Sequence, residues 1–209
     1  KSDLNLLKID PEVNLYLKKN LDYLDSIWED HLLSSTPIQY LCGLAFWRDL
    51  KLKVNKKVLI PRPETELIID IVVKIFGKTS KKLFFAELGT GSGAISIALA
   101  LAYPLWQGIV TDIDQDALNI AVKNCINYSQ QSNLQFYCGN WWKPIENFKG
   151  KLDLVISNPP YIPKDYYENL PKEVKKYEPK IALLGGEDGL MHIREIIQKA
   201  PLFLNEKGL

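Results

Sequence analysis

The chain has 209 residues, of which 46% are hydrophobic and 24% are charged, so its composition is that of a globular protein with one large or two unequal domains. Its 26 lysines and arginines nearly balance 25 aspartates and glutamates, and the net charge of +1 gives no reason to expect affinity for nucleic acids or membranes. The three cysteines lack C-x-x-C spacing and there are two histidines, which argues against a disulfide framework and against a zinc site. A calcium loop at Asp112 to Asp116 is not expected either, because Ala117 replaces the required glycine and Lys123 the terminal glutamate, so we predict no metal site.

The first part of the chain has the pattern of a small helical unit. Apolar side chains recur at near-helical spacing from residue 4 to residue 33. Asp10-Pro11-Glu12 has the form of an N-cap followed by proline in the first turn of a helix. We therefore predict an N-terminal helical domain over residues 1–36.

A β-hairpin is expected to link this unit to the rest of the chain. Residues 46–54 alternate roughly with period two, as a half-buried strand does. Asn55-Lys56-Lys57 is expected to turn the chain into a second short strand at residues 58–61. We assign residues 37–62 to this linker.

The remaining residues, 63–209, alternate between helical and β-rich runs. Pro63-Glu64-Thr65-Glu66 begins a predicted helix that ends before Gly77, and its acidic first turn suits the helix dipole. This order predicts an α/β fold with a parallel, doubly wound, Rossmann-like sheet. The later predicted segments are strand 83–88, helix 92–103, strand 108–112, helix 115–128, strands 134–138 and 152–157, and helix 188–203.

A glycine-rich turn follows the first predicted strand of this sheet. Gly89, Gly91 and Gly93 permit a tight turn, a close approach of the backbone to a ligand, and exposed N–H groups where the next helix starts. The run also satisfies the dinucleotide fingerprint G-x-G-x-x-G/A. By itself it therefore leaves NAD and S-adenosylmethionine equally open as cofactors.

Three further side chains are placed to contact such a cofactor. Asp112 closes the next predicted strand, where a carboxylate can bind the diol of a ribose. Trp141 follows the third strand, where its ring could stack on adenine or belong to the core. Glu87 is expected near the methionine end of S-adenosylmethionine, either meeting its ammonium group or serving a structural role.

The tetrapeptide Asn158-Pro159-Pro160-Tyr161 follows the predicted strand 152–157. Its two prolines remove two backbone donors and fix φ, which leaves a rigid turn rich in carbonyl acceptors. The Asn158 side chain and the Pro159 carbonyl could accept both hydrogens of a substrate NH2 group, with the Tyr161 ring packed against it. A dehydrogenase would instead need a proton donor here, and none is placed. The turn therefore favours methyl transfer to a planar nitrogen, which mainly requires positioning.

Six motifs occur in order along residues 36–209: Pro37 to Gly43, Leu59 to Glu66, Glu87 to Gly93, Ser157 to Ile162, Glu178-Pro179, and Gly185 to Leu190. Together they resemble the bacterial release-factor glutamine methyltransferases, the HemK/PrmC family. The tetrapeptide alone is shared with amino-methyltransferases that act on adenine or cytosine in nucleic acids.

The resemblance implies transfer of a methyl group from S-adenosyl-L-methionine to the side-chain amide nitrogen of the glutamine in the Gly-Gly-Gln motif of class 1 peptide-chain release factors. The product would be S-adenosyl-L-homocysteine. It also implies a class I methyltransferase sheet of seven strands behind a small helical domain and a hairpin linker. Compared with that family, the first 36 residues are short and the last strands are missing, so we expect the chain to be cut short at both ends.

Patterns and resemblance together assign the following roles. Asn158 and Pro159 are the predicted catalytic residues. The predicted substrate contacts are Arg62, Asn158, Pro159, Pro160 and Tyr161, and the predicted cofactor contacts are Glu87, Gly89, Thr90, Gly91, Ser92, Gly93, Asp112, Trp141 and Asn158.

Two alternative substrates stay open. A related enzyme methylates a ribosomal-protein glutamine and carries Arg-Ser-Pro in its linker, so Arg62-Pro63-Glu64-Thr65 favours the release-factor branch. A nucleic-acid amino-methyltransferase would need a basic, aromatic-bearing recognition segment, which the sequence does not display. We expect a cytoplasmic monomer that acts on release factors, without direct binding to nucleic acid or membrane.

Overall fold

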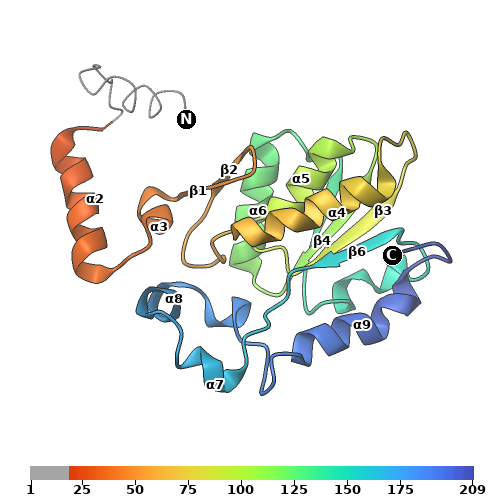
Figure 1. Ribbon diagram of the computed structural model, residues 1–209. Helices are drawn as coiled ribbons and strands as arrows, with labels where there is room; N and C mark the ends of the chain where they lie inside the picture. Colours follow the sequence, from red (N-terminus) through yellow and green to blue (C-terminus); the bar gives the residue numbers. More distant parts are fainter. Residues whose placement is uncertain (1–18) are drawn as a thin grey trace. The chain divides into compact units, whose positions relative to one another are not determined.

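The computed structural model describes residues 19–209, and the prediction of a helix start at Asp10-Pro11 lies outside the described residues. The chain divides into two units after Thr36 (Figure 1). Each unit is described by itself below.

In the first unit, helix α2 spans Leu21–Ser34. The Asn20 side chain caps its start by accepting the Tyr23 N–H at 3.1 Å, and this contact satisfies one of the N–H groups that the first turn leaves unpaired. The helix ends at Ser35, whose φ of 58° is left-handed. A helix therefore lies in the second half of the region predicted to be helical.

The second unit begins with the linker, whose order is helix α3 (Ile38–Cys42), strand β1 (Leu44–Trp47) and strand β2 (Leu50–Lys53). The two strands pair antiparallel and form a hairpin whose turn is Arg48-Asp49. This hairpin turns within the residues predicted to form one strand. A turn does lie at residues 55–57, where the Val58 N–H donates to the Asn55 carbonyl at 3.1 Å, but the predicted second strand at residues 58–61 is wrong.

Tertiary contacts explain where the hairpin turns. Arg48 has a left-handed φ of 48°, and its N–H donates to the Glu66 carboxylate at 3.0 Å. Its guanidinium also pairs with Asp70 at 2.9 Å. These partners lie in the following helix, so the sequence of the hairpin alone does not reveal the turn.

The core of the second unit is a parallel sheet in the order β5-β4-β3-β6. This arrangement confirms the predicted α/β, Rossmann-like fold class, and the four strands lie where the sequence predicts them. The strands are β3 (Phe84–Leu88), β4 (Gln107–Asp112), β5 (Leu134–Cys138) and β6 (Leu154–Ser157), and the main helices are α4 (Glu66–Phe76), α5 (Ala94–Ala102), α6 (Gln115–Asn127) and α9 (Met191–Phe203).

Hydrophobic clusters cover both faces of this sheet. On one face, side chains of α4 and α5 pack on alternate strand residues such as Phe85 and Val110. On the other face, Ile196 and Phe203 of α9 pack on residues such as Ala86. Because both faces are covered, eight of the eleven residues of the inner strands β3 and β4 are buried, as is usual for parallel strands.

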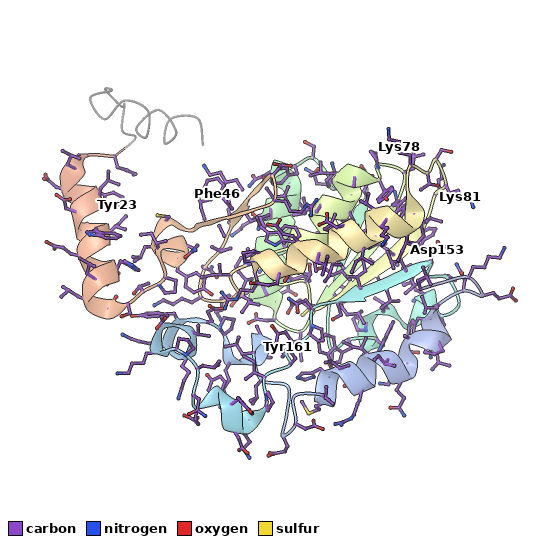
Figure 2. All side chains as sticks on the ribbon, in the orientation of Figure 1. Tyr23, Phe46, Lys78, Lys81, Asp153 and Tyr161 are labelled. Carbon is purple, nitrogen blue, oxygen red and sulfur yellow. The ribbon has the colours of Figure 1, made fainter. Side chains whose placement is uncertain are left out.

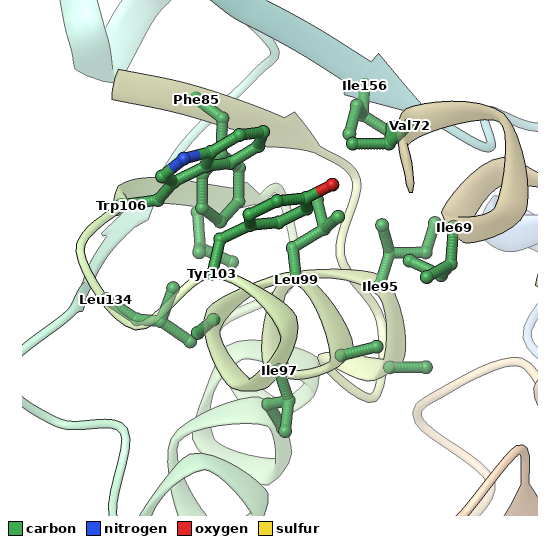
Figure 3. Close-up of a cluster of buried hydrophobic side chains, with 14 of the residues drawn as sticks. Ile69, Val72, Phe85, Ile95, Ile97, Leu99, Tyr103, Trp106, Leu134 and Ile156 are labelled. Carbon is green, nitrogen blue, oxygen red and sulfur yellow. The ribbon is translucent and has the colours of Figure 1, made fainter. Parts of the chain in front are cut away.

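Aromatic rings fill the first of these clusters (Figure 3). The ring of Trp106 stacks on Tyr103 with centroids 4.0 Å apart and also lies near Phe85. Gly108 of β4 makes room for this packing, because a Cβ atom there would lie 2.4 Å from the Phe85 ring and 2.5 Å from Leu134. The core thus requires glycine at this position.

Between β6 and α9 the chain forms short elements that the sequence did not predict. They are helix α7 (Lys164–Tyr167), helix α8 (Lys172–Tyr177) and the 3-10 turn η3 (Lys180–Ala182). Helices of this length show too few turns to establish a period of 3.6 residues. Among the described residues, the sheet has four strands rather than the seven that the family resemblance implies. No helix in residues 19–209 has the length and apolar character needed to cross a bilayer.

Candidate functional site

A cleft lies at the carboxyl ends of β3, β4 and β6, where open parallel sheets usually bind ligands. Part of its wall is formed by the linker residues Lys57, Val58, Leu59, Pro61 and Arg62. Ten predicted site residues line the cleft: Arg62, Glu87, Gly89, Thr90, Gly91, Ser92, Asp112, Trp141, Asn158 and Pro160. Three others, Gly93, Pro159 and Tyr161, do not belong to its lining.

Backbone hydrogen bonds between neighbouring strands hold the glycine-rich turn. The N–H groups of Gly89 and Thr90 both donate to the Thr111 carbonyl at the end of β4, at 2.9 and 3.0 Å. Gly89 has a φ of 74°, and a Cβ atom there would lie 3.1 Å from the ring of Trp141. Glycine is therefore required at this position both for its backbone angle and for the close approach of the indole.

Gly93 is the one glycine of the motif that does not line the cleft. It has a φ of 83° at the start of α5, and a Cβ atom there would lie 3.2 Å from the Cβ of Ala121 in α6. Its role in this structure is to bring two helices together rather than to face a ligand.

Asp112 ends β4 beside the glycine-rich turn. One carboxylate oxygen accepts the Gly91 N–H at 2.8 Å, and the other accepts the Asp114 N–H at 3.0 Å. Burial raises the pKa of Asp112, while these backbone hydrogen bonds oppose the rise. Each oxygen retains acceptor capacity, so the carboxylate can bind a diol.

Glu87 is a buried carboxyl group in the wall of the cleft, with an exposed fraction of 1%. Its Oε2 atom accepts hydrogen bonds from the Thr90 hydroxyl at 2.7 Å and the Ser96 N–H at 3.0 Å. Burial raises its pKa to about 7. No lysine, arginine or histidine within residues 19–209 forms an ion pair with it. A cationic group of a bound ligand could therefore serve as the ion-pair partner of the Glu87 carboxylate.

Trp141 follows β5 and has a left-handed φ of 44°. Its ring lies over Gly89 and 5.3 Å from the ring of His192, which also lines the cleft. Gly139 and Asn140 line it as well. The sequence analysis missed both of these, although their position after a strand end was a usable signal.

Asn158 follows β6 and is half-buried in the same cleft. Its Nδ2 donates to the Thr65 hydroxyl at 3.2 Å. Ser157 anchors the start of the turn, because its hydroxyl donates to the Leu88 carbonyl at 2.7 Å. The Asn158 amide and the glycine-rich turn therefore share one cavity, as the sequence predicts.

Arg62 lines the cleft but also has a structural partner that the sequence did not reveal. Its guanidinium donates to both carboxylate oxygens of Glu178, at 2.7 and 2.8 Å. The Glu178 side chain is 2% exposed and that of Arg62 is 36% exposed. A buried carboxylate needs a partner, and this ion pair joins the linker to the segment after α8.

Tyr161 lies on the loop between β6 and α7 (Figure 2). The residue is 58% exposed. The turn at residues 185–189 contacts the backbone of Tyr161 and Ile162. The Gly185 N–H donates to the Ile162 carbonyl at 2.8 Å, and a Cβ atom at Gly189 would lie 2.4 Å from the Tyr161 carbonyl oxygen. The glycines of this turn therefore permit direct packing on the loop backbone.

These features fit S-adenosylmethionine. Glu87 offers a buried negative charge for an ammonium group, and Asp112 offers acceptors for a ribose diol. A Cβ atom at Gly91 would meet no atom within 4 Å, so the turn leaves open space beside them. Within the described residues, no three or more His, Cys, Asp or Glu side chains form a group that could hold a metal ion.

The sequence is similar to those of known proteins. A family model described as "Methyltransferase small domain" matches residues 65–170. The release factor glutamine methyltransferase of Prochlorococcus marinus is 42% identical over 208 residues, which cover 99% of this chain and 71% of that protein. Those of Thermosynechococcus vestitus and Bacillus cereus are 38% and 42% identical, and the matches cover 99% and 83% of this chain and 70% and 61% of those proteins.

The fold is similar to that of solved methyltransferase structures. The hMettl16 catalytic domain in complex with the MAT2A 3′UTR hairpin 6 matches 72% of this chain and 56% of that chain, with a TM-score of 0.57 and 18% identity. A SAM-dependent methyltransferase from Agrobacterium tumefaciens matches 77% of this chain and 47% of that chain, with a TM-score of 0.52 and 15% identity. At these identities the likeness concerns the fold alone.

Proposed function

The chain belongs to the release factor glutamine methyltransferase family, and on that premise we propose that it methylates the side-chain amide nitrogen of the glutamine in the Gly-Gly-Gln motif of class 1 peptide-chain release factors. The methyl donor is S-adenosylmethionine. The observation that carries the proposal is the cleft shared by the glycine-rich turn and Asn158.

At the cofactor end, three features of the chain would hold the donor. Glu87 would pair with its ammonium group, Asp112 would accept from its ribose hydroxyls, and the Trp141 ring would offer an apolar face to its adenine. S-adenosylmethionine, when bound, supplies a methyl group activated by a sulfonium charge.

At the acceptor end, the chain would position the glutamine amide. The Asn158 Oδ1 atom and the carbonyl of Pro159, which lies between two residues of the cleft lining, would accept its two N–H hydrogens. This would orient the nitrogen lone pair in the cleft. Positive charge that develops on the nitrogen would be stabilised by the same two acceptors, and the methylated nitrogen would then release one of its protons to solvent. Pro159 and Pro160 lack N–H groups, so neither competes for those acceptors.

The test is methylation of an intact release factor by the full-length protein with S-adenosylmethionine, followed by mass spectrometry of the peptide containing Gly-Gly-Gln. We expect a gain of one methyl group on the glutamine and none on a Gly-Gly-Ala variant of the factor. An unmodified factor would refute the proposed substrate. Methylation of adenine or cytosine in RNA or DNA by the same preparation would support the nucleic-acid alternative instead.

We also propose that the enzyme acts as a monomer in the cytoplasm, where translation termination takes place. The net charge of +1 supports an interaction that does not depend on direct binding to nucleic acid. Light scattering on the full-length protein, alone and with its release factor, would test the predicted monomer.

A further inference from the structure

Thr65 occupies a position where threonine usually has a different role. It is the N-cap residue of α4, and an N-cap hydroxyl normally accepts an N–H from the first turn of its own helix. Here φ is −68° and ψ is −18°, which are helical angles, and the side chain makes no capping hydrogen bond. The 3-10 turn η1 (Pro63–Thr65) leads directly into α4, with the Thr65 N–H donating to the Arg62 carbonyl at 3.1 Å. The hydroxyl is therefore not used to start the helix.

The hydroxyl instead accepts a hydrogen bond from the Nδ2 atom of Asn158, at 3.2 Å and across 93 positions of sequence. Both side chains are half-buried and both line the cleft. Within residues 19–209, no other protein acceptor is found for this Nδ2 atom. The contact thus joins the residue predicted to hold the substrate to the start of α4.

We propose that Thr65 is a positioning residue for methyl transfer: its hydroxyl fixes the plane of the Asn158 amide so that Oδ1 accepts from the substrate amide. The inference rests on the proposed function. An asparagine amide has a donor end and an acceptor end of almost equal shape, and rotation about its last bond exchanges them. When a substrate NH2 group donates to Oδ1, the Nδ2 hydrogens need an acceptor, and Thr65 supplies one. Without it, Nδ2 is left unsatisfied in a partly buried site and the amide rotates more freely.

Kinetics of the full chain test this role. Thr65→Val keeps the shape of the side chain and removes the hydroxyl, so we expect kcat to fall about 10-fold with little change in the affinity for S-adenosylhomocysteine. Thr65→Ser keeps the hydroxyl and should stay within about threefold of wild type. The melting temperature of Thr65→Val should fall only slightly, because the hydroxyl does not cap α4 and the Nδ2 atom that loses its acceptor is only partly buried.

A double-mutant cycle tests whether the effect of Thr65 on kcat depends on Asn158. Thr65→Val should cause no further loss of kcat in an Asn158→Ala background, since the amide that it positions is gone. Thr79→Val is the matched control, because it removes a hydroxyl that accepts an N–H at the exposed Lys81. It should leave kcat unchanged. Equal losses from Thr65→Val in both backgrounds would overturn the inference.

A substrate-independent readout distinguishes failure of this inference from failure of the proposed function. The side-chain amide signals of Asn158 can be identified in an NMR spectrum by their loss in Asn158→Ala. We expect Thr65→Val to shift them and Thr65→Ser to preserve them. Unchanged signals in Thr65→Val would refute the contact. If wild type leaves the release factor unmethylated, the proposed function fails, and the amide signals alone decide whether Thr65 holds Asn158.

Discussion

The two ends of the cleft are built in different ways. At the cofactor end, Gly89, Gly91 and Asp112 are joined by hydrogen bonds between adjacent strands and the turns that follow them. At the acceptor end, Asn158 contacts Thr65 across 93 positions, and Arg62 contacts Glu178 across 116. The first end follows from the local geometry of neighbouring β-α units, whereas the second requires the whole domain to pack. We therefore expect substitutions at the two ends to affect different measurable quantities.

The largest effect is expected at Asn158. Asn158→Ala should lower kcat by about 100-fold or more, because it removes an acceptor that orients the substrate amide. Binding of S-adenosylhomocysteine, followed by the rise in melting temperature, should change far less. Asn119→Ala, which alters an exposed asparagine of α6, is the control. Turnover at the wild-type rate in Asn158→Ala would show that other groups hold the amide.

The ion pair between Arg62 and Glu178 should affect stability more than cofactor binding. Arg62→Gln leaves a buried carboxylate without its partner, and the free energy of unfolding should fall by about 3 kcal/mol in urea titrations. Replacing both residues with methionine should restore most of this loss.

Two comparisons sharpen the Arg62 experiment. Lys164→Gln breaks an exposed ion pair with Glu187, and it should cost less than about 1 kcal/mol. If the double methionine variant regains stability but keeps a raised KM for the release factor, Arg62 also contacts the substrate. If KM returns to its wild-type value, the predicted substrate role of Arg62 is refuted.

Glu87 should make stability and cofactor binding respond to pH in opposite directions. Its pKa is raised from 4.5 to about 7 in the folded protein, so between these values the unfolded chain loses the proton that the folded protein keeps. Wild type should therefore lose up to about 3 kcal/mol of stability as pH rises through this window. Binding of the cationic cofactor needs the ionised carboxylate and should strengthen over the same range.

Glu87→Gln should remove both responses. The variant should be more stable than wild type at about pH 8, while its affinity for S-adenosylmethionine should be low at every pH. Urea titrations and calorimetric binding between about pH 5 and pH 8 would measure both quantities. A wild-type affinity that does not vary with pH would refute the pairing of Glu87 with the cofactor ammonium.

Two glycine substitutions compare the two ends most directly. Gly89→Ala places a Cβ atom 3.1 Å from the Trp141 ring, and it should weaken cofactor binding while leaving kcat at saturation nearly unchanged. Gly189→Ala places one 2.4 Å from the Tyr161 carbonyl oxygen, and it should lower kcat while sparing cofactor binding. Each also pays about 1–2 kcal/mol for a left-handed φ.

Gly150→Ala is the matched control for these two variants, because it has a φ of 69° and its Cβ would meet no atom within 4 Å. It should lower stability without changing either kinetic quantity. If Gly89→Ala and Gly189→Ala altered the same quantity, the division of the cleft into two independently built ends would be wrong.

Features that depend on neighbouring residues were predicted from the sequence, and features that depend on distant contacts were missed. The strands, the glycine-rich turn and Asp112 were predictable because a buried parallel strand leaves a continuous apolar run and its end positions the next residues. The hairpin turn at Arg48-Asp49 was missed because contacts with Glu66 and Asp70 select it. The short helices α7 and α8 carried no usable period.

The sequence by itself determined the fold class, the cofactor turn and the identity of the Asn158 tetrapeptide, since each depends on residues that are neighbours along the chain. Only the tertiary structure decided that Thr65 contacts Asn158, that Glu178 pairs with Arg62, and that Gly189 braces Tyr161. A hydrogen bond between side chains far apart in sequence depends on how the intervening elements pack. No local pattern of residues predicts which distant side chains will come into contact. The contacts at the acceptor end of the cleft are therefore known only from the folded domain.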